Sequence, residues 1–307
     1  MCLVHKSEFA GKDIALNYIL LNLMRNKLAV VLFLSLLANE SFSLSLDSLN
    51  FKLKKLRQAS LVAESDAEML KLNAQFRLDL LNALKDQRQI NFDSIPNLSV
   101  VKAPKDEFRI ISWNIAFKDY SFYYDGILSK KQKKDWVHYP LKDISQRVES
   151  ANNQQGSASA WYGLLYYDIV SFGKAKDQQY LLLAWDGNDQ YSNMKVIDVL
   201  WFDEAGLPRF GKKVFNTPYL SNTRVIFEYS KDASMSLRYE EKKEWLVFDH
   251  LSPLQPNMKG MYEFYVPDLS FDALRYTNKK WQLIQNVDVR GDQTMDDYNT
   301  PPASPLR

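Results

Sequence analysis

The chain is poor in cysteine and histidine, and this shortage limits the chemistry it can perform. Among 307 residues there are three histidines and one cysteine, Cys2. If residues 1–43 are removed during export, as the next paragraphs argue, the working chain has no cysteine. Disulfides, a thiol nucleophile and zinc binding through sulfur are then excluded.

Several sequence motifs and any strong charge excess are also missing. The sequence contains no GxGxxG, GxxxxGK[ST] or GxSxG pattern. These patterns build the phosphate-binding turns of nucleotide sites and the serine turn of many hydrolases. The formal net charge is only +2, so no overall field would attract nucleic acid or an anionic membrane. We therefore expect no nucleic-acid partner.

Only one long apolar run is present, and it lies in residues 24–43. Arg25 and Lys27 precede an apolar stretch over residues 28–38, and small residues follow at Ser41 and Ser43. This order is typical of a secretory signal peptide. The stretch is too short for a transmembrane helix, which needs about 20 apolar residues.

The signal peptide predicts where the working chain begins and where it acts. We expect cleavage before Leu44, initiation at Met24, and residues 1–23 to be an upstream extension assigned in error. The product is then a periplasmic or secreted protein with no transmembrane span in its mature chain. A near-absence of cysteine fits bacterial export better than export by a eukaryote.

Residues 44–90 contain neither glycine nor proline, and their pattern predicts helices. Apolar residues recur at three- and four-residue spacings between Leu46 and Leu84. The polar residues 63–66 are expected to separate two antiparallel helices, with Ser65 capping the second. We favour packing of this stripe on the following domain, and an oligomerising coiled coil is the alternative.

The remainder of the chain has the composition of a β-protein. Residues 91–105, which contain Pro96 and Pro104, are expected to form a linker. Over residues 106–290 about a dozen aromatic and β-branched runs alternate with turn signals. We predict a mainly β fold, in which an antiparallel meander is closed or stacked as a barrel or propeller-like domain behind the helical segment. Residues 291–307 are expected to be a disordered tail.

Two hairpins are predicted within this β-rich part. One turns at Lys118 and Asp119, and the other turns over residues 230–234. The second hairpin would place Arg224 and Glu228 opposite Arg238 and Glu240, as cross-strand ion pairs.

Candidate catalytic residues are few and come from turns. Several aspartates follow an aromatic residue at the end of a strand, and two of them could converge as a catalytic pair. Asp186, Asp249 and His250 are the candidates for such a site. The simpler interpretation is that these aspartates accept backbone N–H groups and start turns.

Calcium is the metal that the sequence favours, although no cofactor is expected overall. Asp186, Asn188 and Asp189 supply hard oxygen atoms within four residues. The same residues, with Gly187, form a good hairpin turn, and we prefer that interpretation.

Seven tryptophans are spread along the chain, about one in each predicted strand. Most of them are expected in the core. Trp136 and Trp161 have polar or glycine-containing surroundings, so they are candidates for exposed platforms on which sugar rings stack.

Several segments resemble a known group of proteins. They include residues 185–188, 195–200, 224–229, 248–253 and 267–272. Together they are similar to uncharacterised exported proteins of Bacteroidetes-type bacteria, over most of residues 108–290. The resemblance implies a location in the cell envelope and supplies no catalytic residues.

These observations lead to one main hypothesis and two alternatives. The chain is expected to be an exported soluble binding or scaffolding protein of the bacterial envelope, whose partner is an unknown envelope component or a glycan. It could instead be a glycan- or peptidoglycan-directed hydrolase with paired aspartates. The third hypothesis is a protein-interaction module that uses the stripe between Leu46 and Leu84.

Overall fold

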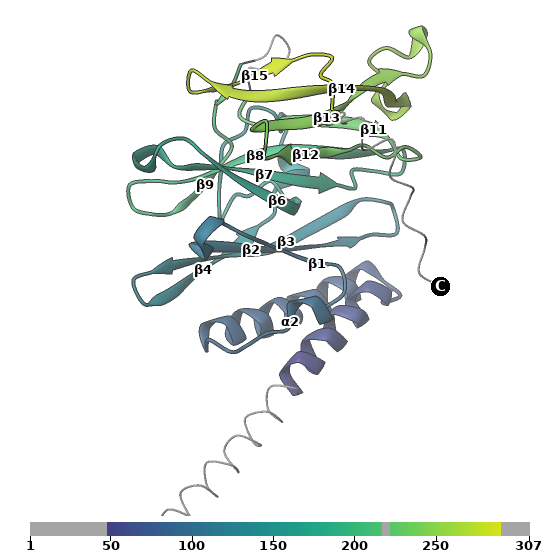
Figure 1. Cartoon of the computed structure of the whole chain (residues 1–307). Helices are drawn as coiled ribbons and strands as arrows, with labels where there is room; N and C mark the ends of the chain where they lie inside the picture. The colour runs from purple at the N-terminus through teal and green to yellow at the C-terminus, as the bar shows by residue number, and fades with distance from the viewer. Residues whose placement is uncertain (1–47, 217–221, 290–307) are drawn as a thin grey trace, which may run out of the picture.

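A layer of helices and three β-sheets are stacked on one another in the computed structural model (Figure 1). The structure describes residues 48–216 and 222–289. The expected upstream extension (1–23), signal peptide (24–43) and tail (291–307) lie outside these residues.

The helical layer is a hairpin of two helices, as the sequence predicts. Residues 48–62 are helical, and α2 spans Asp66–Lys85. Ser65 caps α2, because its side chain accepts the backbone N–H of Glu68 at 3.3 Å. None of the described helices is long and apolar enough to cross a membrane.

The apolar stripe packs on the first sheet, but its phase changes between the two helices. Leu53 is buried as expected. The predicted spacing, continued from Leu46 into α2, reaches Leu70, Ala74, Arg77 and Leu81. The buried side chains lie one position earlier, at Met69, Asn73, Phe76 and Leu80. The turn at residues 63–65 resets the helical phase, so a repeat continued through it fails.

Polar contacts also fix the hairpin on the first sheet. Arg57 is fully buried and donates to the carbonyl oxygens of Asn114 (2.7 Å) and Asn97 (3.2 Å). In α2, Asn73 donates to Asp125 Oδ2 at 2.9 Å and accepts the indole N–H of Trp113 at 2.7 Å. Arg57 and Asn73 are therefore both paired with groups of the first sheet, although Arg57 Nε is buried without a hydrogen-bond partner in the described part of the chain.

The first sheet is an antiparallel meander in chain order. Its strands are β1 (Leu98–Lys102), β2 (Phe108–Ala116), β3 (Phe122–Gln132) and β4 (Asp135–Lys142). The hairpin predicted at Lys118 and Asp119 is confirmed, since Ala116 pairs with Phe122. Residues 91–105 are not a simple linker, because they contribute β1.

The second sheet is the middle layer. Its strands are β5 (Gly156–Ser157), β6 (Leu165–Phe172), β7 (Gln179–Asp186), β8 (Ser192–Phe202), β9 (Pro208–Phe210) and β11 (Val225–Ser230). The order is β5-β9-β8-β7-β6, and β11 also pairs with β8.

The third sheet has the order β10-β15-β14-β13-β12. Its strands are β10 (Phe215–Asn216), β12 (Leu237–Glu240), β13 (Trp245–Pro253), β14 (Tyr265–Thr277) and β15 (Lys280–Ile284).

Short 3-10 turns connect elements throughout the fold: η1 (Phe92–Ser94), η2 (Pro104–Asp106), η3 (Ser145–Arg147), η4 (Ala175–Asp177), η5 (Pro256–Met258) and η6 (Tyr262–Phe264).

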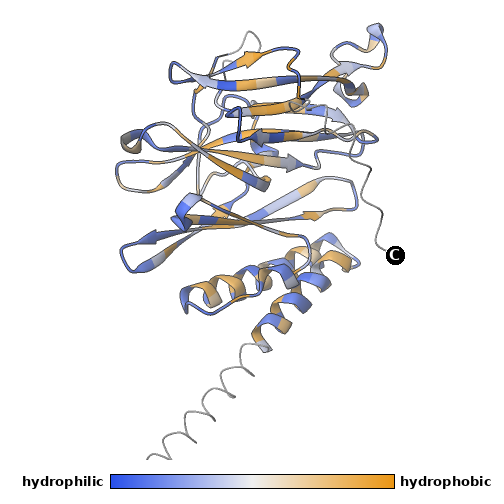
Figure 2. Cartoon of the chain, viewed as in Figure 1, coloured by the Kyte–Doolittle hydropathy of each residue, from blue (hydrophilic) through white to orange (hydrophobic). Residues whose placement is uncertain are grey.

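The middle sheet is apolar on both faces because it separates two cores. In β7, Leu182 packs towards the first sheet, whereas Leu181 and Leu183 pack towards the third. Hydrophobic segments accordingly occur in every layer (Figure 2). The mainly β prediction is confirmed in its stacked form, since none of the described sheets closes into a barrel.

The hairpin predicted over residues 230–234 is wrong. Strand β11 pairs with β8 of the middle sheet, and β12 pairs with β13 of the third. The turn therefore carries the chain from one sheet to the next, and the cross-strand ion pairs expected there do not form. Arg224 instead pairs with Asp198.

Candidate functional site

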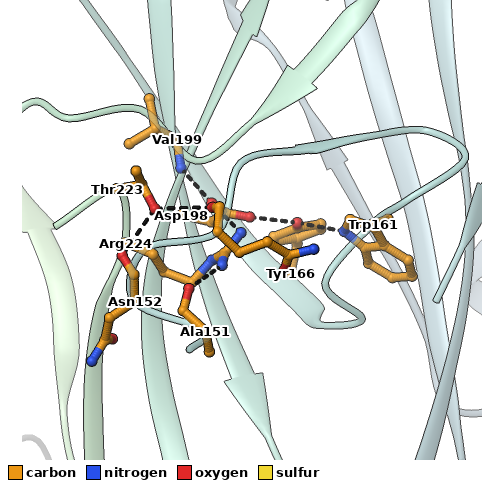
Figure 3. A network of polar contacts seen from close by, with 9 residues as sticks. Ala151, Asn152, Trp161, Tyr166, Asp198, Val199, Thr223 and Arg224 are labelled. Carbon is orange, nitrogen blue, oxygen red and sulfur yellow. Dashed lines mark hydrogen bonds and ion pairs between the residues drawn. The ribbon is translucent and has the colours of Figure 1, made fainter. Parts of the chain in front are cut away.

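A buried polar network lies between the first and middle sheets (Figure 3). The fully buried side chains of Arg224 and Asp198 approach to 3.1 Å. Asp198 also accepts the hydroxyl of Tyr166 at 3.2 Å and the backbone N–H of Val199 at 2.8 Å. The indole N–H of Trp161 donates to the Tyr166 hydroxyl at 2.8 Å, which extends the chain of bonds.

The same network holds a loop over residues 151–154. Arg224 Nη1 donates to the carbonyl oxygen of Ala151 at 2.6 Å. The Thr223 hydroxyl lies 2.9 Å from the carbonyl oxygens of both Asn152 and Gln154. Since all of these contacts are internal, the network mainly supports the fold, although Arg224 Nε, Asn152 Oδ1 and Gln154 Oε1 are buried without a hydrogen-bond partner among the described residues.

This network overturns the expectation that Trp161 is an exposed platform. Its side chain is fully buried, and its ring packs against Tyr166 with centroids 6.0 Å apart. The neighbouring glycine suggested an open loop, but Gly163 is where the chain passes close to Asp143. A substituent on Gly163 would lie 2.4 Å from the Asp143 carboxyl carbon.

Trp136, the other platform candidate, is half-buried in β4. The Arg109 guanidinium lies 4.9 Å from its ring centroid, and the Lys131 ammonium lies 5.1 Å from it. These cations already occupy part of the ring surface by cation–π contacts. A role for Trp136 in glycan binding stays a prediction.

Asp186 ends β7 and lies in a cleft between the first and middle sheets. The cleft has a volume of about 440 Å³. Its apolar walls are the rings of Phe122, Tyr124 and Tyr162. Its polar lining is Asp119, Ser121, Ser145, Gln146, Asp186 and Asn188. Aromatic rings beside amides, hydroxyls and carboxylates suit a ligand with both apolar faces and hydroxyl groups.

The hydrogen bonds of Asp186 leave one of its oxygen atoms available. Oδ1 accepts the hydroxyl of Tyr124 at 2.8 Å and the backbone N–H of Asn188 at 2.9 Å. None of the hydrogen bonds found among the described residues uses Oδ2. Burial is the main cause that raises the pKa of Asp186 above its ordinary value, and nearby Asp143 adds to this effect.

The loop after Asp186 is tightly fitted against the first sheet. The backbone N–H of Gly187 donates to the Tyr124 hydroxyl at 2.8 Å. A Cβ on Gly187 would lie 2.3 Å from the Phe122 ring, so only glycine passes at this distance. The cleft is therefore held in shape by contacts between the two sheets.

The same loop was a candidate for calcium, and some of its oxygen atoms already have partners. The Lys231 ammonium donates to the carbonyl oxygens of Gly187 (2.9 Å) and Asp189 (3.0 Å). Asp189 Oδ1 accepts the N–H groups of Tyr191 (2.7 Å) and Ser192 (2.9 Å), as expected for a turn. The Lys231 ammonium therefore adds a positive charge beside this loop.

Metal binding remains without support elsewhere too. Within residues 48–216 and 222–289, no group of three or more His, Cys, Asp or Glu side chains is arranged to hold a metal ion. Calcium at Asp186, Asn188 and Asp189 stays an untested prediction.

His250 and Asp249 lie apart from Asp186, in β13 of the third sheet. His250 Nδ1 donates to the buried Asp272 carboxylate at 2.8 Å, and its Nε2 is 3.9 Å from Asp268. Asp249 accepts the backbone N–H of Ser236 at 2.7 Å and so anchors the start of β12. Asp249 and His250 do not line the Asp186 cleft.

No protein-family model matches the chain, and no curated protein or solved structure is significantly similar to it. The function therefore has to be argued from the site itself.

Several residues of the cleft escaped the sequence analysis. Phe122, Tyr124 and Gln146 carry no motif, and Tyr162 lies between a buried tryptophan and a glycine. The available signal was the aromatic stretch directly after the predicted turn at Lys118 and Asp119. Aromatic residues at the mouth of a hairpin are placed to line the gap between two packed sheets.

Proposed function

We propose that this chain is an exported soluble binding protein of the bacterial envelope, and that the Asp186 cleft takes a neutral glycan. One observation carries this proposal: Asp186, whose Oδ2 takes part in none of the hydrogen bonds found among the described residues, lines a cleft that is walled by Phe122, Tyr124 and Tyr162. The carboxylate can accept a sugar hydroxyl while the rings contact the apolar side of the sugar. The expected signal peptide over residues 24–43 supports export.

The carboxylates in and near the cleft favour binding over hydrolysis. A glycoside hydrolase needs two carboxyl groups that are free to act on the bond. Asp143, whose charge acts on Asp186, accepts three backbone N–H groups, from Tyr124, Ser145 and Gly163 (2.8–3.1 Å). Its carboxylate is therefore committed to holding the loop, and Asp186 lacks a free carboxylate partner in the cleft lining other than the exposed Asp119.

The helical stripe is a weaker basis for a function as an interaction module. Leu53, Leu80 and Leu84 are buried against Ile111, Trp113 and Ile127 of the first sheet. These leucines are already covered by the chain itself, so a partner would have to use another face of the helices.

Isothermal titration calorimetry of the purified chain with the trisaccharide of N-acetylglucosamine tests the proposal. Asp186→Asn should weaken binding about tenfold, because a hydrogen bond to a charged group is replaced by a neutral one. The matched control Asp135→Asn changes an exposed aspartate in β4 and should leave the affinity unchanged. Equal affinities for Asp186→Asn and the unaltered chain would refute a role for this cleft.

A further inference from the structure

The outer face of the third sheet carries a second hollow, on the side away from the core. The ladder between β12 and β13 pairs Arg238 with Val247 and Glu240 with Trp245, so these four side chains share one face. Alternate residues of the same strands belong to the core between the middle and third sheets: Leu237, Leu246 and Phe248. The first four therefore point outward.

A cavity of about 510 Å³ lies over this face. Besides those four residues it is lined by Lys242 and Lys243 of the hairpin turn and by Val289. The chain after β15 returns beside the sheet, where the Val287 N–H donates to the carbonyl oxygen of Phe271 at 2.8 Å. The hollow thus has a sheet as its floor and backbone along its side, and its volume is within the usual range of ligand sites.

Positive charge is concentrated in this hollow. Arg238, Lys242 and Lys243 line it together with a single carboxylate, that of Glu240. Among the described residues, none of these three cations lies within 4.0 Å of a carboxylate oxygen. Arg275 is exposed and directly opposite Trp245 in the ladder with β14, which adds a fourth cation beside the hollow.

Two of these cations are held by neutral groups. Arg238 Nη1 donates to the Ser236 hydroxyl at 3.1 Å, and the Lys243 ammonium donates to the carbonyl oxygen of Asp288 at 2.9 Å. These contacts are made to uncharged atoms and position the side chains. An anion that enters the hollow would meet these cationic side chains and form charge-assisted hydrogen bonds with them.

The ring of Trp245 in this hollow indicates which kind of anion would bind there. Trp245 is half-buried, and the Lys243 ammonium lies 5.4 Å from its ring centroid. An indole face beside a cation suits a sugar ring that carries a carboxylate. Glu240 can accept a sugar hydroxyl, but it would repel a compact dianion such as phosphate.

We propose that this hollow is a second binding site, and that it takes acidic glycans whose sugar rings carry carboxylates. Arg238 and Lys242 bind the carboxylates, Trp245 stacks on a sugar ring, and Glu240 accepts a hydroxyl. The site is distinct from the Asp186 cleft, which lies between the first and middle sheets and is walled by different residues.

Calorimetry with a galacturonate trisaccharide tests this assignment, with the carboxyl-reduced neutral trisaccharide as the comparison ligand. We expect the acidic sugar to bind at least tenfold more tightly. Arg238→Gln and Lys242→Gln should each weaken its binding about tenfold. Lys259→Gln, which removes an exposed cation elsewhere in the β13–β14 connection, should have no effect, and Asp186→Asn should have none either.

Three results would overturn the proposal. They are equal affinity for the acidic and neutral sugars, equal weakening by Lys259→Gln and Arg238→Gln, and displacement of the sugar by an equimolar amount of inorganic phosphate. Circular dichroism melting curves check that each variant is folded. Arg238 and Lys242 are exposed side chains, so their variants should fold and keep the proposal testable.

Discussion

Asp125 should make the stability of this protein depend on pH, through the contact between the helical hairpin and the first sheet. Its carboxylate is buried in β3, where it accepts the Asn73 amide at 2.9 Å and the Gly126 N–H at 3.0 Å. Arg77 approaches only to 3.6 Å. Burial therefore outweighs these partners and raises the pKa of Asp125 from 3.8 to about 6.

The sign and size of the effect follow from this shift. A carboxyl with a higher pKa in the folded chain binds its proton more tightly there, so acid favours the folded state. Folding stability should fall as the pH rises from about 4 through 6, and then level off. The difference between 3.8 and about 6 corresponds to about 3 kcal/mol, at about 1.4 kcal/mol for each pH unit.

Urea unfolding of the purified chain between pH 4 and pH 7.5 measures the effect, and Asp125→Asn isolates it. Other carboxylates have lowered pKa values and give the opposite slope, but they are present in both proteins: Asp106, Asp119, Asp203 and Asp268. We expect the unaltered chain to lose about 2 kcal/mol more than Asp125→Asn over this range, because at pH 4 the carboxyl of the unfolded chain is already more than half ionised. Parallel stability curves for the two proteins would refute the reasoning.

Two further substitutions test the contacts between the sheets by urea unfolding. Arg224→Met should destabilise the chain by about 3–5 kcal/mol, because it leaves the Asp198 carboxylate buried and unpaired, and adding Asp198→Leu should restore most of the loss. If Arg224→Met alone lowered the free energy of unfolding by no more than the double variant does, this reasoning would be contradicted. Gly187→Ala should cost about 1–3 kcal/mol, since the added methyl would lie 2.3 Å from the Phe122 ring. An unchanged urea midpoint would show that Phe122 moves aside freely.

Local signals in the sequence predicted the elements well. Strands β2, β7, β8 and β13 coincide with runs of aromatic and β-branched residues, because such residues fit a buried pleated surface. Ser65 was predicted as a helix cap from its place before an acidic first turn, and its hydrogen bond to Glu68 confirms this.

Pairing between strands was harder to predict, and β11 shows the reason. Residues 231–233 look like a hairpin turn, yet β11 pairs with β8, which is 11 residues long. Strand β9 covers only Leu200 to Phe202 on that edge of β8, so residues 192–197 need another partner. Whether β11 pairs with β8 therefore depends on the length of β8, and the residues of the turn after β11 carry no information about that length.

The surroundings of Asp186 and His250 were the least predictable part, because they join residues that are distant in the sequence. Asp186 was a candidate from its turn, but Tyr124, which binds its carboxylate, comes from another sheet 62 positions away. His250 was grouped with Asp186, whereas its actual partner, Asp272, lies across the ladder in β14. Which charged and polar residues meet in a stack of sheets depends on how the strands are ordered, and the spacing of residues along the sequence does not give that order.

The stacking itself explains why both proposed sites lie at the periphery. The middle sheet is covered on both faces, and two of its buried charged residues, Asp198 and Arg224, form an ion pair. A ligand can therefore reach the stack only where two sheets part, as at Asp186, or on an outer face, as at Trp245. The Asp186 cleft is bounded by residues that contact one another across two sheets, and a site held in this way loses little affinity to rearrangement when a ligand binds.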